Sequence, residues 1–380
     1  MTKNIPFHIP TLTGSESDRV AEACRDAHAL QSDGRYSRRC SELLEQHLGV
    51  GQILFTPSCT AGLEIAAMLT AGPGDEVIVP SYTFVTSVSA FTNLGVKPVF
   101  CDIREDTLNI DESKISELIS TRTKAIVAVH YGGISCAMDE INKIAADRGI
   151  PVVEDAAQAL SGKYKKQALG AVGNIACFSF HSTKNYHCGE GGALVVDDAE
   201  LFARAEIHRE KGTNRKAFFR GQVDKYTWVD RGSSYVPSEL NMAFLSSQLE
   251  RIDEIRHRRK LLFKQYMQTL QTLEDSGQIR LPVVPEYCDP SYHLFYVLLE
   301  DLRSRDALLE HLNKRGIGAT FHYVPLHNSP VGAALHDGRS LPVTERLHER
   351  LLRLPLYPDL CGEDIDLICR TIYQFFANRS

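Results

Sequence analysis

The sequence predicts an α/β protein with a large domain on a mostly parallel central sheet and a smaller C-terminal α+β domain. Two observations carry this prediction. Short apolar runs alternate with helical patterns in the first half of the chain, and these runs are apolar enough to be buried on both faces. After Ser238 the pattern changes to a long helical stretch followed by shorter, mixed elements. We place the boundary within that stretch, which divides the chain into residues 1–250 and 251–380.

The first half of the chain contains five predicted strands that precede or follow helical patterns. Three further strands follow without long helices between them. The predicted strands are 52–55, 76–80, 96–103, 124–131, 151–156, 164–169, 176–180 and 192–196. In a parallel sheet, functional groups gather at the carboxyl ends of the strands, so we looked there for a site.

The second half begins with residues 238–270, which have apolar residues at helical spacing and which we predict to be one long helix joining the two domains. Beyond it we predict strands at 291–300 and 317–324, and helices at 304–316, 343–353 and 363–376. This order indicates a small α+β domain.

Composition excludes several classes of protein. The 380 residues include 42 Lys and Arg against 48 Asp and Glu, and the net charge of −6 leaves no basic field for wrapping nucleic acid. The N-terminal residues do not resemble a signal peptide, and no apolar run is long enough to span a membrane. The ten cysteines form no C-x-x-C pair, which favours reduced thiols in a cytoplasmic protein and argues against a metal site.

Three local features have chemistry that fits together. Asp155 ends the apolar run 151–156, and Gln158 follows on the next helical turn. Lys184 follows the strand 176–180 and precedes the glycine-rich CGEGG (188–192). A third feature, TPSCTAGLE (56–64), places Thr60 and Ala61 at a helix start, where backbone N–H groups favour phosphate. Taken singly, a helix cap explains the first and third features, and a solvated surface lysine the second, better than a functional role does.

Together the three features suit pyridoxal 5′-phosphate (PLP). A lysine in a buried setting forms the Schiff base, a carboxylate keeps the pyridine nitrogen protonated, and a helix start holds the phosphate. Phe84, just after the strand 76–80, is a candidate for stacking on the ring, although a core aromatic is an equal alternative. The sequence contains no P-loop, Rossmann, G-x-S-x-G or H-E-x-x-H motif in the required setting.

Longer motifs resemble the DegT/DnrJ/StrS family of sugar-nucleotide aminotransferases, which have the type I, aspartate-aminotransferase-like fold of PLP enzymes. The likeness runs over nearly the whole chain, in PSCTAGLEIA, GDEVIVPSYTFVTS, VVEDAAQ, FSFHSTKNY, GEGGALV and FHYVPLH. It implies that Lys184 is the Schiff-base lysine and proton shuttle. The other implied contacts are Asp155 with the pyridine nitrogen, Gln158 with the hydroxyl side of the ring, Thr60, Ala61 and Ser179 with the phosphate, Phe84 with the ring face and His322 with the substrate.

Family members are typically homodimers with active sites at the subunit interface. The segment 212–228 combines basic residues with aromatics, and we predict that Arg215 or Arg220 meets the diphosphate of a nucleotide sugar there; a solvated loop is the alternative. Tyr36, in RYSRR (35–39), is a further candidate for substrate binding. Val236 departs from the family pattern, because many members carry Asn or Arg there, reaching the partner's cofactor phosphate.

Residues 209–235 are similar to the subgroup that aminates C4 of dTDP-4-keto-6-deoxy-D-glucose with L-glutamate, giving dTDP-4-amino-4,6-dideoxy-D-galactose and 2-oxoglutarate. The resemblance also implies a role in surface-polysaccharide synthesis. The alternatives are amination at C3, or at C4 with the opposite stereochemistry. A sugar dehydratase of this fold has His in place of the lysine, so Lys184 argues against it, and a non-catalytic PLP-binding regulator is a further alternative.

Overall fold

The computed structural model describes residues 3–26 and 30–378 and contains the predicted alternation of strands and helices. The strands are β1 (Ile53–Thr56), β2 (Glu76–Pro80), β3 (Lys97–Cys101), β4 (Thr123–Val129), β5 (Val152–Asp155), β6 (Lys163–Tyr164), β7 (Gln167–Ala168), β8 (Ile175–Ser179), β9 (Gly192–Val196), β10 (Cys288–Asp289), β11 (Phe295–Leu298) and β12 (Leu351–Leu354). The α-helices are α1 (Glu16–Arg25), α2 (Arg35–Leu48), α3 (Cys59–Thr70), α4 (Thr86–Thr92), α5 (Glu112–Leu118), α6 (Met138–Ala146), α7 (Ala199–Arg209), α8 (Arg215–Phe219), α9 (Glu239–Leu249), α10 (Ile252–Asp275), α11 (Leu302–Asn313), α12 (Pro330–Leu335), α13 (Pro342–His348) and α14 (Gly362–Ala377).

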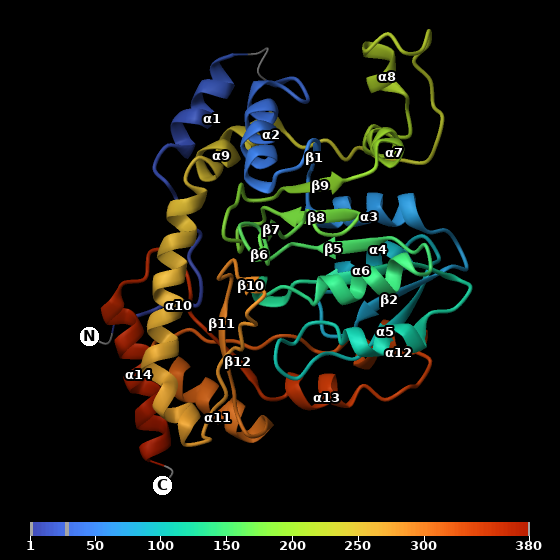
Figure 1. Cartoon of the computed structure of the whole chain (residues 1–380). Helices are drawn as coiled ribbons and strands as arrows, with labels where there is room; N and C mark the ends of the chain where they lie inside the picture. Colours follow the sequence, from blue (N-terminus) through green and yellow to red (C-terminus); the bar gives the residue numbers. More distant parts are fainter. Residues whose placement is uncertain (1–2, 27–29, 379–380) are drawn as a thin grey trace.

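The central sheet has seven strands in the order β1-β9-β8-β5-β4-β2-β3 (Figure 1). The pairs β2–β3, β2–β4, β4–β5 and β5–β8 are parallel, whereas β9 is antiparallel to both β8 and β1. Six strands therefore run in one direction and β9 in the other, which confirms the mostly parallel sheet. The ends of β4, β5 and β8 consequently lie side by side.

Both faces of this sheet are buried, as the apolar runs predict. Ile78 of β2 packs into one core, with helices α2, α6 and α9. Its neighbours Val77 and Val79 point to the opposite face and pack into a second core, with helices α3, α4 and α7. Because successive side chains of a strand alternate between faces, each strand contributes to both cores.

A third core joins the C-terminal elements α10, α11, α14, β11 and β12. Figure 1 shows α10 and α14 side by side at the edge of the molecule, and the two helices pack together. Ile5 belongs to this core and bridges to Ile317, so the N-terminal segment lies against the C-terminal part of the chain. No helix among the described residues is long and apolar enough to cross a membrane.

Two predicted elements before residue 275 differ in the structure. The predicted strand 164–169 is the hairpin β6–β7, because Lys165 has a φ of 54° and turns the chain back on itself. The predicted helix 238–270 is two helices, α9 and α10, because the backbone at Arg251 (φ −113°, ψ 20°) leaves the helical region. This break lies at the predicted domain boundary, and the division at residue 250 stays a prediction.

Two further differences concern the C-terminal part. The helix predicted at 343–353 ends at His348, and Leu351–Leu354 form strand β12, antiparallel to β11. The predicted strand 317–324 is wrong: only isolated bridges occur there, including one between Thr320 and Arg353. The pairing of β12 with β11 decides the first outcome, because it aligns the apolar run 351–354 with a partner that sequence periodicity does not reveal.

Candidate active site

A cavity of about 560 Å³ lies at the carboxyl ends of the central strands. The central sheet supplies His130 after β4, Asp155 at the end of β5 and Ser179 at the end of β8. The C-terminal part supplies the opposing wall, and Phe7 and His8 of the N-terminal segment complete it. The cavity is therefore where the topology of the sheet predicts a site.

Most of the predicted site residues meet in this cavity. Those that line it are Lys184, Asp155, Gln158, Thr60, Ser179, Phe84 and His322. Ala61 is not among the residues that line it; it lies in the first turn of α3, where its N–H donates to the Ser58 hydroxyl. The structure therefore gathers residues from five distant segments of the sequence around one cavity.

Lys184 follows β8 in a turn in which its backbone N–H donates to the carbonyl of His181, 2.8 Å away. Removal from water by the surrounding protein lowers the pKa of its amine, and the nearby Arg353 guanidinium adds to that effect. Cys59 and Asp155 act in the opposite direction on this pKa but do not reverse it. The lowered pKa favours the neutral, nucleophilic amine.

The carboxylates of Glu154 and Asp155 point to opposite faces of β5 and have different roles. Asp155 faces the cavity, where its Oδ2 accepts a hydrogen bond of 2.6 Å from the Ser87 hydroxyl and its Oδ1 accepts one of 3.1 Å from the Ala157 N–H. These two donors fix the orientation of the carboxylate and leave it aimed at the cavity.

Glu154 is fully buried away from the cavity and holds the loop after β7. It accepts hydrogen bonds from the N–H groups of Gly170, Val172 and Gly173 and from His130 Nε2. Burial alone would raise the pKa of Glu154, but the bonds from His130 and the loop hold it below its usual value. Glu154 is therefore a structural anion, and Asp155 is the residue available for chemistry.

The Gln158 amide is held at both ends. Its Oε1 accepts from the Gly132 N–H at 2.7 Å, and its Nε2 donates to the Tyr323 hydroxyl at 3.2 Å. Because both groups are engaged, the amide plane has one orientation at the cavity wall. Tyr323 belongs to the C-terminal part, so this bond also links the two walls of the cavity.

The start of α3 has the donors that a phosphate requires. The Ser58 hydroxyl caps the helix by accepting from the Ala61 N–H at 3.1 Å, and Thr60 lines the cavity together with Ser179. A Cβ at Gly192 would lie 2.4 Å from the Ser58 carbonyl carbon, so the glycine lets β9 pack directly against this helix start. These groups together fit PLP: the helix N–H groups and two hydroxyls suit its phosphate, the amine suits its aldehyde and the carboxylate suits its pyridine nitrogen.

Sequence reasoning missed residues on the C-terminal wall. Arg353 of β12 donates through Nη1 to His322 Nε2, and the His322 ring stacks on Tyr323 with centroids 4.1 Å apart. Burial, followed by the charges of Arg353 and Lys184, lowers the pKa of His322 to about 2, so this imidazole is neutral. The available signal was a charged residue inside the apolar run LLRL (351–354).

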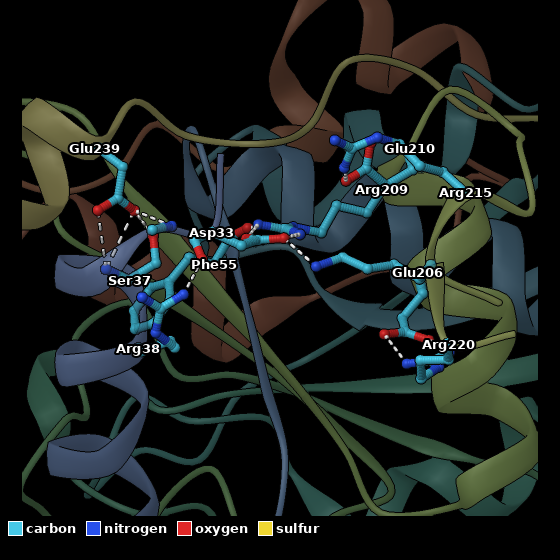
Figure 2. A network of polar contacts seen from close by, with 12 residues as sticks. Asp33, Ser37, Arg38, Phe55, Glu206, Arg209, Glu210, Arg215, Arg220 and Glu239 are labelled. Atoms are coloured by element: carbon cyan, nitrogen blue, oxygen red, sulfur yellow. Dashed lines mark hydrogen bonds and ion pairs between the residues drawn. The ribbon is translucent and has the colours of Figure 1, made fainter. Parts of the chain in front are cut away.

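Arg215, Arg220 and Tyr36 do not line the cavity of their own chain. Arg215 pairs with Glu210 at 3.3 Å and Arg220 pairs with Glu206 at 2.6 Å, both beside α7. Figure 2 shows these pairs next to Arg209, which is buried and bound to Asp33. The Tyr36 hydroxyl donates to Glu22 at 2.9 Å within the packing of α2. Their predicted contact with substrate stays a prediction about a site shared with a second chain.

Comparisons with known proteins agree with this geometry. Residues 11–373 match the model of the DegT/DnrJ/EryC1/StrS aminotransferase family. The structure is similar to the aminotransferase TlmJ from Streptoalloteichus hindustanus (32% identity, 100% of both chains, TM-score 0.91). It is also similar to DesV from S. venezuelae (31%, 98% of this chain and 99% of that one, TM-score 0.89). A third similar structure is the PLP-form of the putative sugar aminotransferase Spr1654 from Streptococcus pneumoniae (27%, 99% of both chains, TM-score 0.90).

Spr1654 has also been solved in its PMP-form, the aminated state of the cofactor. The fold of the present chain is the type I fold of PLP enzymes, its cofactor is PLP, and its activity is transamination. Since the family match spans nearly the whole chain and includes every residue that lines the cavity apart from Phe7 and His8, the chain belongs to the DegT/DnrJ/EryC1/StrS aminotransferase family.

Proposed function

We propose that this aminotransferase moves the amino group of L-glutamate to C4 of dTDP-4-keto-6-deoxy-D-glucose, giving dTDP-4-amino-4,6-dideoxy-D-galactose and 2-oxoglutarate. The observation that carries the proposal is the cavity in which Lys184 and Asp155 face the same space. The likeness of residues 209–235 to the C4-aminating subgroup supports this choice of sugar. The free cysteines of this chain support a role in the reducing environment of the cytoplasm.

The residues of the cavity divide the work of transamination. PLP supplies an aldehyde that takes up the amino group and a pyridinium ring that withdraws electrons from the reacting carbon. Asp155 holds the proton on the pyridine nitrogen, and Ser87 holds Asp155 in place. Lys184 Nζ accepts the α-proton of glutamate and later returns a proton to the sugar carbon that receives the amine. The Gln158 amide, fixed by Gly132 and Tyr323, orients the hydroxyl side of the ring.

The enzyme in this proposal is a homodimer with shared sites. The segment 211–233 supports the idea because it exposes large aromatic side chains: Phe219 is 68% exposed and Trp228 is 79% exposed. Exposed apolar groups that lie close together are typical of protein–protein interfaces. Arg215 and Arg220 of one subunit would then approach the diphosphate bound in the other. Val236 has no polar group for the partner's cofactor phosphate, and Ser234, Ser238 or the GTNR segment (212–215) would replace that contact.

The alternative function is the same chemistry with a different outcome, at C3 or at C4 with the opposite stereochemistry. A panel of nucleotide sugars distinguishes amination at C4 from amination at C3, whereas the stereochemistry at C4 requires analysis of the product. The aminated enzyme is mixed with 4-keto and 3-keto dTDP-6-deoxy sugars, and the return of the aldehyde-form absorbance of the cofactor is followed. The proposal expects the highest kcat/KM with the 4-keto sugar, and a preference for the 3-keto sugar contradicts it.

A further inference from the structure

Arg353 is a partly buried cation without an anionic partner. It lies on β12, lines the active-site cavity and forms no ion pair with any described carboxylate. Its Nη1 donates to the ring of His322, which is neutral, and its Nε is buried with no hydrogen-bond partner among the described residues. Phe7 covers the guanidinium, with Cζ 4.8 Å from the centroid of the Phe7 ring. A partly buried charge with a buried, unpartnered N–H group is costly unless an anion compensates it.

Arg259 shows how the same protein satisfies a buried arginine that has a structural role. Its guanidinium donates to the carbonyls of Tyr292, His293 and Leu356, which joins α10 to two loops. Arg353, which is partly buried, has no such set of carbonyl acceptors, although its Nε is also enclosed by protein. The guanidinium of Arg353 therefore still has N–H groups free to donate, whereas that of Arg259 donates to three carbonyls. Arg353 also lines the cavity.

A second donor near Arg353 is also unpartnered. Tyr131 lines the cavity, and its buried hydroxyl lies beside the Tyr82 hydroxyl, whose own proton is donated to the His322 carbonyl. The Tyr131 O–H therefore has no acceptor among the described residues. The charge of Arg353 acts on the Tyr131 hydroxyl, and their common neighbour His322 lies 6.2 Å from Tyr131 between ring centroids. A guanidinium and a hydroxyl, both with unused N–H or O–H groups, are the donors that bind a carboxylate.

We propose that Arg353, assisted by the Tyr131 hydroxyl, binds a carboxylate of the amino-acid donor and so selects glutamate in the first half of the reaction. The proposal rests on the proposed function only in taking an amino acid as the donor. Lys184 on the sheet wall and Arg353 on the C-terminal wall face one cavity, so a donor whose amine is at Lys184 meets Arg353 with its carboxylate. The cavity carboxylates do not compete, since Asp155 is held by Ser87 and Glu190 is near His181.

The sugar nucleotide is the other source of negative charge, through its diphosphate. A single-turnover experiment on the PLP-loaded enzyme separates the two ligands, because the donor half-reaction needs no nucleotide sugar. The loss of the visible absorbance of the cofactor is followed with L-glutamate, with L-alanine, which lacks the side-chain carboxylate, and with 4-aminobutanoate, which lacks the α-carboxylate. Calorimetric titration with 2-oxoglutarate gives affinity without turnover.

Arg353→Met is expected to weaken the binding of L-glutamate and 2-oxoglutarate on the order of 10- to 100-fold, since a charge-assisted hydrogen-bond pair is lost. Arg353→Lys should recover part of the affinity, and Tyr131→Phe should lose less than Arg353→Met. If Arg353 binds the α-carboxylate, the variant loses affinity for L-alanine but not for 4-aminobutanoate, and the opposite pattern indicates the side-chain carboxylate. In either case KM for the nucleotide sugar stays unchanged.

Arg350→Met is the matched control, because Arg350 precedes the same strand, binds the Leu299 carbonyl and does not line the cavity. Unchanged affinity for 2-oxoglutarate in Arg353→Met overturns the proposal. A raised KM for the nucleotide sugar with a normal donor half-reaction also overturns it and indicates the diphosphate as the ligand. If the product is a different amino sugar while donor binding still depends on Arg353, the proposed function fails and this inference stands.

Discussion

Lys184 and Asp155 are far apart in sequence but adjacent in space, because β5 and β8 are neighbours in the sheet and both residues lie at or after the ends of these strands. The polarity of parallel strands explains why sequence reasoning found both. A carboxylate or amine at the carboxyl end of an apolar run is directed to the edge where ligands bind. Glu154, one residue earlier, points to the other face and has a structural role.

The assignment of Lys184 is tested by covalent labelling. We expect the purified PLP-loaded enzyme to absorb visible light, and borohydride reduction to fix the cofactor on Lys184, because burial lowers the pKa of this amine. Peptide mapping identifies the labelled residue. Lys163 and Lys165 on the nearby hairpin are internal controls, and a label on either of them would show that the assignment is wrong.

Asp155→Asn tests the role of the carboxylate at the pyridine nitrogen. The variant should fold and bind PLP, but turnover should fall by about two orders of magnitude or more, because the protonated ring loses its counter-ion. Ser87→Ala is the graded control: it removes one hydrogen bond to Asp155 Oδ2 and should reduce kcat much less. Near-normal turnover in Asp155→Asn would mean that Asp155 is only a helix cap.

His322 makes stability depend on pH. Its pKa is near 6.5 in an unfolded chain and about 2 in the folded protein, mainly because of burial, so protons bind preferentially to the unfolded state. The stabilisation is fully present above about pH 6.5 and is lost progressively as the pH falls toward 2. In His322→Gln, the decrease in the free energy of unfolding from pH 7.5 to 5.5 should be smaller by about 1.4 kcal/mol. Urea titrations at both pH values measure the free energy of unfolding. If it decreases by the same amount in His322→Gln and in the wild type, the pKa shift of His322 is contradicted.

At the scale of elements, the segment that begins at α8 combines ion pairs to its own chain with exposed aromatic side chains. Two of its basic residues form ion pairs at the end of α7, Arg220 with Glu206 and Arg215 with Glu210 (Figure 2). Its aromatic side chains, Phe219 and Trp228 above all, are exposed. The two guanidinium groups are partly exposed, whereas the carboxylates of Glu206 and Glu210 are buried. A diphosphate that binds these guanidinium groups therefore has to compete with both carboxylates.

Replacing both Arg215 and Arg220 with Ala should raise KM for the nucleotide sugar about tenfold or more, since charge-assisted contacts to the diphosphate are lost. The glutamate half-reaction should be unchanged. Lys225→Ala, in the same segment, is the control. If the double variant impairs both half-reactions equally, the segment has a structural role. If KM for the nucleotide sugar does not change, the diphosphate binds elsewhere, for example at residues 35–39.

Elements that depend on long-range pairing were the ones the sequence could not predict. Residues 343–353 read as a helix because apolar residues recur at helical spacing, yet Leu351–Leu354 pair with β11. That error concealed Arg353, since a helix would have placed it on a surface.

The long helix 238–270 was predicted without its break at Arg251, because no glycine or proline marks it.

At the scale of the whole molecule, the active site depends on three distant parts of the chain closing over one sheet edge. The central sheet supplies Lys184 and Asp155, the C-terminal part supplies His322 and Arg353, and the N-terminal segment supplies Phe7. Ile5 anchors that segment in the C-terminal core. Sequence periodicity predicted the first part well, but a wall made by packing between parts has no local signal.

The identity of the product tests the central claim most directly. The enzyme is incubated with dTDP-4-keto-6-deoxy-D-glucose and ¹⁵N-labelled L-glutamate, and the sugar product is analysed by NMR. The account predicts nitrogen on C4 in the axial, D-galacto orientation, seen as small proton couplings at H4, with 2-oxoglutarate formed in equal amount. Nitrogen on C3, an equatorial amine on C4, or a product without ¹⁵N would contradict it.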